Sequence, residues 1–407
     1  MATAIGMAGN VRFKGLLLPL NRHFPMPTPL TFEILHQSSD CHARLGRLTT
    51  PHGTVETPAF MPVGTQASVK GLTPNLVRGM GADAILVNTY HLMLRPGSDL
   101  VAEMGGLHRW MGWPGTIITD SGGFQVFSLA DLRRIGDEGV TFRSHIDGAS
   151  VTLTAARSIQ AQNALGADII MAFDDCPPAS EAGGAVQAAR VQDACERSLR
   201  WLGQSIAAHQ RRDDQALFGI VQGGTDLERR AWCAKRVVEH DLPGYAIGGV
   251  AVGEGFEALC RVVAHTAPLL PATRPRYLMG VGYERDMLAA VRAGVDLFDC
   301  VLPTRNGRNA NAFTREGAMR LRNARFARDE RPLDPTCDCP VCAPASDCAV
   351  GRLGPFSRSY LRHLFMAGEM LGPMLVSLHN IRHFQRFMLD IRRAIAHNDW
   401  SLATAGP

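Results

Sequence analysis

Hydrophobic side chains are concentrated in eight short runs, each about as long as a buried strand. The runs cover residues 57–63, 83–90, 115–120, 168–175, 216–224, 245–253, 276–282 and 296–301. Their nearly continuous apolar character is typical of parallel strands that are covered on both faces. The pattern therefore predicts eight parallel strands.

The segments between several of these runs have apolar residues at three- and four-residue spacing. This spacing predicts helices over residues 154–166, 226–240, 255–267 and 284–293. Thr73 before Pro74, and also Thr154, are typical helix starts. Eight strands that alternate with helices predict an α/β fold, a (β/α)8 TIM barrel. The alternative is an open doubly wound sheet, although no G-x-G-x-x-G follows the first strand.

Three further segments fall outside this alternation. Residues 133–153 are typical of an inserted hairpin with HIDGAS as its turn, and residues 380–396 form an amphipathic pattern that predicts a C-terminal helix. Residues 1–28 show no period, so we expect a disordered extension, or a start codon placed too early with Met26 as the true start. We divide the chain into this extension, a catalytic barrel over 29–325 and a C-terminal subdomain over 326–407.

Polar residues and a glycine stand at the ends of five predicted strands. They are Asp120, Asp174, Gln222, Gly249 and Asp299. Because barrel enzymes carry their chemistry at the C-terminal ends of the strands, these residues are the candidate site. Asp299 precedes a basic, glycine-containing segment that we interpret as a turn. Its carboxylate could be a cap, an ion-pair partner or a nucleophile directed at a polyanion.

Three cysteines, Cys337, Cys339 and Cys342, lie within six residues in a C-x-C-x-x-C pattern. This spacing is typical of a zinc site, and a site with four protein ligands is structural. The candidates for the fourth ligand are Cys348, His363, His379 and His383. The ten cysteines are otherwise dispersed and do not predict a disulfide framework.

Composition narrows the class of protein only slightly. A formal net charge of +4 excludes a strongly basic nucleic-acid coat but leaves room for a local basic patch. No apolar run approaches the roughly 18–20 residues of a membrane span, so we expect no membrane association. A reducing cytoplasm is the expected location.

An ordered set of motifs resembles one known family. The motifs are TDSGGFQ, MAFDDC, GIVQGG, GGVAVGE, FDCVLPTRNGR and CDC-x2-C followed by LHN. In this order they resemble the queuine/preQ1 tRNA-ribosyltransferases, the tRNA-guanine transglycosylases, over about residues 30–395. The resemblance implies a barrel with a zinc-binding subdomain. It also implies a pentosyltransferase of queuosine biosynthesis, which exchanges guanine at wobble position 34 of tRNAs with GUN anticodons for preQ1.

The resemblance also implies roles for the candidate residues. Asp299 would be the nucleophile of a double displacement through a covalent ribose–tRNA intermediate, and Asp120 the general acid/base. Cys176 and Val252 match the bacterial form of the family, which takes preQ1. Asp175 is expected to be a cap or a solvent-facing residue. The implied base-binding residues are Asp174, Gln222, Gly249, Phe124, Cys176, Val250 and Met279.

For the remaining ligands the resemblance implies contacts with the tRNA anticodon stem-loop, and a homodimer. The residues expected on the RNA are Gly280, Val281, Gly282, Asp286, Thr304, Arg305, Asn306, Gly307 and Arg308. One structural zinc per subunit would be held by Cys337, Cys339, Cys342 and His379. The chain departs from the family pattern at 154–158 and 283–285, and an insertion at 343–356 contains the rival ligand Cys348.

Two alternatives from other classes stay open. One is a non-catalytic tRNA-binding subunit, which would be expected to lose the catalytic carboxylates that this chain retains. The other is a barrel glycoside hydrolase, against which the basic segment and the cysteine cluster argue. Binding to tRNA separates the hydrolase from both the transglycosylase and the non-catalytic subunit.

Overall fold

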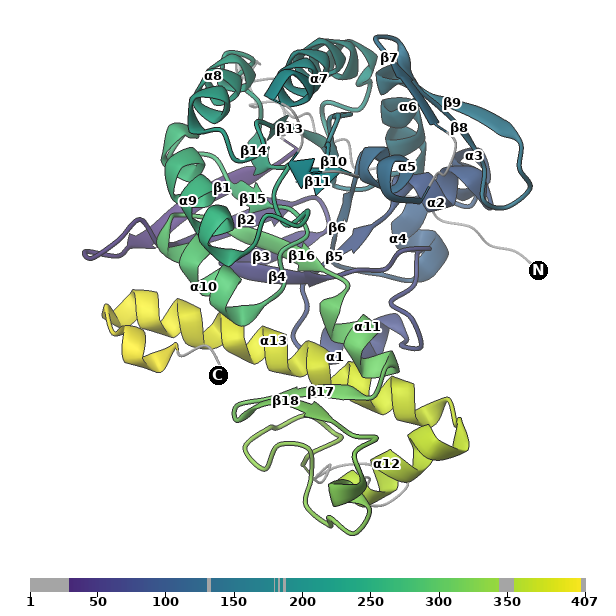
Figure 1. The fold of residues 1–407 in the computed structure, drawn as a ribbon, viewed down its shortest axis with the longest axis vertical. Coiled ribbons are helices and arrows are strands. Elements are labelled where there is room, and N and C mark those ends of the chain that lie inside the picture. The colour runs from purple at the N-terminus through teal and green to yellow at the C-terminus, as the bar shows by residue number, and fades with distance from the viewer. Residues whose placement is uncertain are drawn as a thin grey trace, which may run out of the picture.

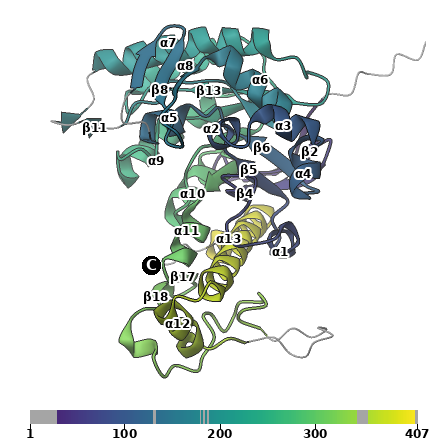
Figure 2. The same ribbon diagram turned by 90° about the vertical axis from the view of Figure 1, so that its right-hand side faces the viewer.

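A computed structural model of the protein describes residues 29–129, 133–178, 180–181, 184–185, 188–343 and 355–403. The prediction of a disordered extension over residues 1–28, including the alternative start at Met26, lies outside the described residues. The same holds for most of the 343–356 insertion and for Cys348. The arrangement of the described elements is shown in Figures 1 and 2.

All eight apolar runs form parallel strands of one sheet. In chain order these are β4 (Ala59–Pro62), β5 (Ala84–Val87), β6 (Thr116–Thr119), β10 (Ile169–Met171), β13 (Ala216–Val221), β14 (Gly244–Ile247), β15 (Arg276–Leu278) and β16 (Leu297–Cys300). The neighbour order is β4-β16-β15-β14-β13-β10-β6-β5. A parallel bridge between Val63 and Leu86 joins the two ends of this order. The barrel prediction is therefore confirmed, and the open doubly wound sheet is excluded.

The predicted barrel helices are present within a residue or two of their expected bounds. They are α6 (Ala155–Leu165), α8 (Leu227–Val238), α9 (Phe256–Thr266) and α10 (Glu284–Arg292). Thr154 caps α6 through a hydrogen bond from the Arg157 N–H, and Thr73 caps α1 (Pro74–Gly79) in the same way. The sequence analysis did not predict α2 (Thr89–Leu94), α3 (Ser98–Glu103), α4 (Gly106–Met111), α5 (Gly123–Leu129) and the long α7 (Ala188–Ala208).

An antiparallel sheet closes the N-terminal end of the barrel. It consists of β1 (Thr31–Gln37), β2 (Arg44–Thr50) and β3 (Gly53–Thr57). Leu48 and Val55 of this sheet are buried in one cluster with interior barrel side chains such as Met171 and Phe218. The interior is thus packed and closed at this end, which leaves the opposite end of the strands for a cavity.

The predicted hairpin over residues 133–153 is a three-stranded antiparallel sheet. Its strands are β7 (Arg133–Gly136), β8 (Gly139–Arg143) and β9 (Ser150–Leu153), and the predicted turn joins β8 to β9. Phe142 and Leu153 are buried against Phe173 and Trp201 of the barrel and of α7. The described parts of the segment that follows β10 include the short strands β11 (Ser180–Glu181) and β12 (Gly184–Ala185).

The expected basic turn after β16 is a helix, α11 (Leu302–Arg308). Pro303 stands in its first turn, where a missing N–H is harmless. A Cβ on Gly307 would lie 2.7 Å from the Ser377 Cα, so glycine allows α11 to pack closely on α13 (Leu371–His397). The turn interpretation was wrong because this helix–helix contact stabilises a segment whose sequence contains few helix formers.

The C-terminal helix α13 begins nine residues before its predicted start at residue 380. Figures 1 and 2 show it between the barrel and a smaller unit with a hairpin of β17 (Asn311–Thr314) and β18 (Gly317–Arg320) and a helix, α12 (Arg358–Ala367). Short 3-10 turns occur at Ala267–Leu269, Ala324–Phe326 and Trp400–Leu402. The predicted apolar side chains Phe384, Phe387, Met388 and Ile391 are all buried. Among the described residues, no helix is both long and apolar enough to cross a membrane.

Candidate active site

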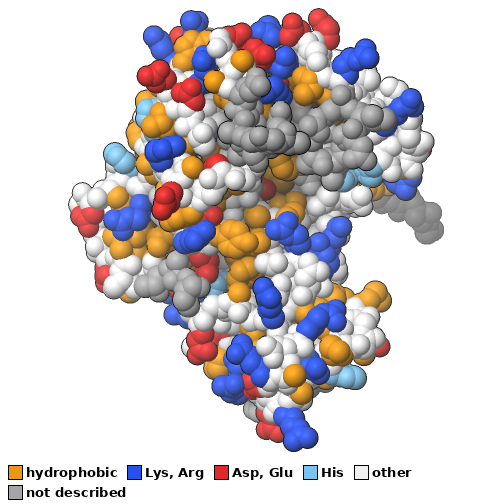
Figure 3. All heavy atoms as spheres, viewed as in Figure 1, with side chains coloured by type: hydrophobic (Ala, Val, Ile, Leu, Met, Phe, Trp, Pro, Cys, Tyr) orange, Lys and Arg blue, Asp and Glu red, His pale blue; other side chains and the backbone are white. Residues whose placement is uncertain are grey.

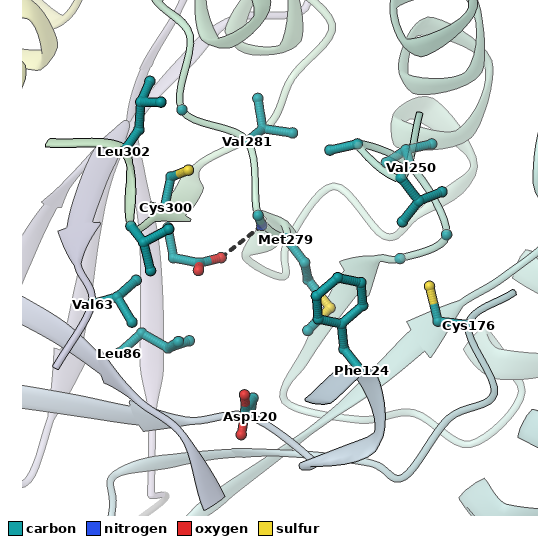
Figure 4. A pocket seen from close by; sticks show the side chains of 18 of the residues that line it. Val63, Leu86, Asp120, Phe124, Cys176, Val250, Met279, Val281, Cys300 and Leu302 are labelled. Atoms are coloured by element: carbon teal, nitrogen blue, oxygen red, sulfur yellow. Dashed lines mark hydrogen bonds between the residues drawn. The ribbon is translucent and has the colours of Figure 1, made fainter. Parts of the chain in front are cut away.

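A cavity of about 630 Å³ opens at the C-terminal end of the barrel strands. Asp120, Asp174, Gly249 and Asp299 line it, and Gln222 is hydrogen-bonded to Asp174. The structure therefore brings together all five residues that were singled out at strand ends. Figure 4 shows part of the wall of this cavity, with Asp120, Phe124 and Met279 labelled.

Asp299 lies within β16 and is only 7% exposed. Its Oδ1 accepts hydrogen bonds from the Tyr277 hydroxyl at 2.5 Å and from the Gly280 N–H at 2.8 Å. Burial raises the pKa of Asp299, and these two donors oppose the rise. Since both donors bond Oδ1, they fix the orientation of the carboxylate and leave Oδ2 available for reaction.

Asp120 directly follows β6, and its carboxylate accepts hydrogen bonds from three donors. The Thr89 N–H bonds Oδ1 at 2.8 Å, while Asn88 Nδ2 and Gln125 Nε2 bond Oδ2 at 2.5 and 2.8 Å. Burial nevertheless raises the pKa of Asp120 to about 6, and the negative charge of Asp299 contributes to the rise. A carboxyl group with this pKa can both give and take a proton near neutral pH.

Asp174 is the third carboxylate of the cavity. Its Oδ1 accepts from the Ser121 hydroxyl at 3.0 Å, and its Oδ2 accepts from Gln222 Nε2 at 2.7 Å. Burial, with a smaller contribution from the neighbouring charges of Asp175 and Asp120, raises the pKa of Asp174 to about 7. The group is therefore poised between its acid and its carboxylate form, and a ligand that donates hydrogen bonds would favour the carboxylate.

Gly249 has a positive φ of 63°, and a Cβ at this position would lie 2.3 Å from the Gln222 Oε1. The resemblance implies that Gly249 binds the base, and its nearest neighbour in the structure is Gln222. The following loop is held by Glu254, whose carboxylate accepts from the Ala251 N–H at 2.6 Å and the Val252 N–H at 3.0 Å. Glycine here keeps Gln222 and the loop in place.

Several apolar side chains complete the wall of the cavity. Phe124 on α5 is 51% exposed, which is unusual for a phenylalanine and excludes an ordinary core role. Met279 is half-buried, while Cys176 and Val250 are buried, and all four line the cavity. Figure 4 shows Phe124, Met279 and Cys176 projecting toward the same space. A flat ligand between an aromatic ring and a thioether fits these surroundings.

The expectation that Asp175 is a cap or a solvent-facing residue was wrong. Its side chain is fully buried and receives two hydrogen bonds from Arg190, at 2.6 and 2.8 Å, and one from Arg197 at 2.6 Å. Both arginines belong to α7. Asp175 therefore ties the loop after β10 to α7, which helps to hold its neighbour Asp174 in the cavity.

The residues expected on RNA do not form one exposed surface. Arg305 and Gly280 are both exposed, and both line the cavity. Arg308 and Asn306 are half-buried, whereas Thr304 and Gly307 are buried in the contact of α11 with α13.

Asp286 is likewise buried, and it accepts a hydrogen bond from the Arg285 Nε at 3.1 Å. Val281 and Gly282 are buried in the wall of the cavity. The departure at 283–285 places Tyr283, 56% exposed, at the cavity mouth. Arg285 lies over the Phe256 ring, with the guanidinium carbon 4.5 Å from the ring centre.

Away from this cavity, Cys337, Cys339, Cys342 and His379 converge on one point, with ligand atoms all within 4.8 Å of one another. The His379 Nδ1 lies 3.5 Å from the Cys339 Sγ and 3.3 Å from the Cys342 Sγ. Its Nε2 is 2.7 Å from the Phe313 carbonyl oxygen, which fixes the proton on Nε2 and leaves Nδ1 as a ligand. The four side chains are buried and could hold a metal ion.

The other histidine candidates for this cluster lie elsewhere. His363 is exposed on α12, and the His383 Nε2 bonds the Glu284 carboxylate at 2.7 Å. His379 is thus the fourth member of the cluster among the described residues.

The sequence analysis missed the groups that orient the carboxylates. Asn88 and Thr89 follow β5 and hold Asp120, while Tyr277 on β15 and Ser121 hold Asp299 and Asp174. Asn88 and Thr89 stand at the end of an apolar run, so the rule that singled out Asp120 could have found them. Tyr277 carries no such signal, because it lies inside β15 and not at the end of the strand.

The raised pKa of Asp174 predicts a pH-dependent stability for the ligand-free protein. A carboxyl whose pKa rises from 3.8 to about 7 on folding binds its proton more tightly in the folded state. Its stabilising contribution is therefore complete below about pH 4 and is lost as the pH rises through 7. We expect Asp174→Asn to be more stable than the wild type at pH 8, by roughly 1–3 kcal/mol. Chemical denaturation at pH 5 and at pH 8 measures the difference in the free energy of unfolding between the two proteins. The difference should be smaller at pH 5, and an equal difference at the two pH values would contradict the account.

Comparison with known proteins identifies the same family that the sequence motifs resemble. The family model described as "Queuine tRNA-ribosyltransferase" matches residues 39–404. Proteins named queuine tRNA-ribosyltransferase from Synechococcus elongatus and Thermus thermophilus are each 53% identical, over 90% of this chain and 92% and 90% of their own lengths. The protein of the same name from Geobacillus kaustophilus is 49% identical over 91% of this chain. The chain belongs to the queuine tRNA-ribosyltransferase family.

Proposed function

We propose that this protein exchanges guanine at wobble position 34 of tRNAs with GUN anticodons for preQ1, a step of queuosine biosynthesis. It is a pentosyltransferase of the tRNA-guanine transglycosylase type. The observation that carries the proposal is the convergence of Asp120, Asp174 and Asp299 on one cavity at the mouth of the barrel. Three carboxylates can there divide the roles of nucleophile, proton carrier and base receptor.

The first displacement uses Asp299 and Asp120. The Asp299 carboxylate attacks C1′ of the ribose as the glycosidic bond to N9 of guanine breaks. The electron pair of this bond leaves with the base, and the Asp120 carboxyl, with a pKa of about 6, supplies the proton that neutralises it. The product is an ester between Asp299 and the ribose, which keeps the RNA attached to the protein.

The second displacement reverses these steps with another base. The Asp120 carboxylate takes the N9 proton of preQ1, and N9 attacks C1′ while the ester bond to Asp299 breaks. The carboxylate of Asp299 and the acid form of Asp120 are restored. Because the proton that leaves with guanine is replaced by the proton taken from preQ1, no external acid or base is consumed.

Base recognition is assigned to the wall of the cavity. The Asp174 carboxylate accepts hydrogen bonds from the donor edge of guanine or of preQ1, and Gln222 and the backbone at Gly249 bind the ring carbonyl. Phe124 and Met279 enclose the ring from its two faces. Val250, Val252 and Cys176 shape the pocket that accepts preQ1, in keeping with the bacterial form of the family.

The tRNA anticodon loop approaches from the side of Arg305, which borders the cavity. Figure 3 shows Lys and Arg side chains across the part of the surface below the barrel, where α11, α13 and the β17–β18 hairpin lie. Arginine suits phosphate and base edges because its planar fork donates two parallel hydrogen bonds. The target nucleotide must leave its stack for its ribose to reach the buried Asp299. The exchange takes place in the cytoplasm, and the enzyme acts as a homodimer.

Zinc is the metal proposed for the cluster of three cysteines and His379. A set of three thiolates and one imidazole suits tetrahedral zinc and keeps no position open for water, so the ion would be structural. It would tie the segment around Cys339 to α13 through His379. The ion takes no part in the exchange.

Replacing either catalytic carboxylate tests the proposed exchange. We expect Asp299→Asn to reduce incorporation of radiolabelled guanine into substrate tRNA by at least about 10³-fold, and Asp120→Asn by about 10²-fold or more. Asp296→Asn is the control, because Asp296 is a buried carboxylate that pairs with Arg44 rather than lining the cavity. It should lower stability and leave exchange per folded molecule unchanged. Normal exchange by Asp299→Asn would refute the mechanism, and tRNA binding without exchange by the wild type would favour a non-catalytic subunit.

Zinc content tests the role of the cysteine cluster. We expect the purified protein to hold about one zinc per chain, and Cys339→Ser to lose both the metal and several degrees of thermal stability. Cys260→Ser is the control, since Cys260 lies on α9 outside the cluster. Elemental analysis that finds one zinc per chain in Cys339→Ser would show that this cysteine is not a ligand.

A further inference from the structure

A buried cation lies directly behind the cavity wall. Arg230, in the first turns of α8, is fully buried. Its Nε donates to the Gly224 carbonyl at 2.9 Å and its Nη1 to the Val221 carbonyl at 3.0 Å. Its other contacts are with the loop after β14, where Nη1 donates to the Gly248 carbonyl at 2.6 Å and Nη2 to the Gly249 carbonyl at 2.9 Å. One guanidinium thus joins the loops after two adjacent strands.

Arg230 forms no ion pair with a described carboxylate that would offset the cost of its burial, and the charge of Glu254 acts on it only from a distance. Among the described residues, no carboxylate oxygen lies within 4.0 Å of its guanidinium, and burial lowers its pKa. A buried charge without a counterion costs several kcal/mol unless it is well hydrogen-bonded. The four backbone carbonyls supply that compensation. The loops that carry them are consequently held by a rigid, planar group rather than by packing alone.

The bonds to Arg230 determine where the neighbouring N–H groups point. In a trans peptide the N–H points opposite to the C=O. Because the Gly248 and Gly249 carbonyls point at Arg230, the N–H groups of Gly249 and Val250 point away from it. The first of them donates to Cys176, whose thiol pKa is raised to about 12 by burial in spite of this bond. Gly249, Val250 and Cys176 all line the cavity, so the peptide groups of these two N–H donors lie on its wall.

We propose that Arg230 is a positioning residue that fixes the Gly249 and Val250 N–H groups as a preformed receptor for the ring carbonyl of the base. The inference rests on the proposed function and deepens it. Guanine and preQ1 share this carbonyl. When the glycosidic bond breaks, the departing base takes up negative charge, part of which resides on the same oxygen. Donors that are fixed in advance stabilise such charge without a cost of reorganisation.

The conservative variant Arg230→Lys tests the proposal, because lysine keeps the charge and loses the fork. Exchange kinetics would give KM and kcat for guanine and the inhibition constant for 6-thioguanine, in which a sulfur, a poorer acceptor, replaces the carbonyl oxygen. We expect KM for guanine to rise about 10-fold and kcat to fall, while 6-thioguanine binds within about twofold of the wild type. The preference for oxygen over sulfur should therefore collapse.

Arg276→Lys is the matched control. Arg276 is also a buried arginine that donates to two backbone carbonyls, those of Gly294 and Leu270, but it lies at the start of β15 and does not line the cavity. It should lower thermal stability and keep the wild-type preference for oxygen. An unchanged preference in folded Arg230→Lys would overturn the proposal. Loss of preference in both variants would show a general effect of destabilisation and overturn it as well.

Amide hydrogen exchange of the wild-type protein tests the same receptor without a variant that has to fold. Guanine should protect the Gly249 and Val250 amides, and 6-thioguanine should protect them less. Equal protection by the two bases, or none by guanine, would contradict the receptor. Protection by guanine in a protein that fails to exchange it into tRNA would contradict the proposed function alone.

Discussion

Three carboxylates, Asp120, Asp174 and Asp299, are buried together at the C-terminal end of the barrel strands. The surrounding structure must hold them there although their burial is unfavourable. Burial raises the pKa of each of them, and the neighbouring charges add to the effect for Asp120 and Asp174. Folding must place these groups against their own electrostatic preference. The closed parallel sheet holds the three carboxylates together, because all its strands end at the same rim. The packed interior of the barrel and the antiparallel sheet at its N-terminal end keep water out of the space beneath this rim.

Hydrogen-bond donors from neighbouring elements give Asp299 and Asp120 different surroundings. Asp299 receives both its donors on one oxygen, from Tyr277 and Gly280, whereas Asp120 is held on both oxygens by neighbours from the β5 end and from α5. The first arrangement leaves the other oxygen free for the nucleophilic role proposed for Asp299. The raised pKa of Asp120, and not its donors, suits the role of proton carrier proposed for it. Behind them, ion pairs such as Asp175 with Arg190 and Arg197 fix the loops on which the site is built.

The strand pattern and the strand-end residues could be predicted from sequence because both obey local rules. Apolar runs indicated all eight strands, and the polar residues and the glycine at the ends of five of them indicated the cavity. The errors occurred where tertiary contacts decide: α11 is a helix because Gly307 lets it pack on α13, and Asp175 is buried because α7 supplies two arginines. Arg230 escaped notice because a lone arginine in a helix gives no sign of burial. The role of Tyr277 likewise depends on a contact between strands.

The central claim is that Asp299 holds the ribose covalently between the departure of one base and the arrival of the next. Peptide mapping by mass spectrometry measures it directly, on protein denatured during turnover with substrate tRNA. The account predicts an RNA fragment attached through ribose to the peptide that contains Asp299. Attachment to the peptide that contains Asp120, or turnover at the normal rate with no attached RNA, would contradict it.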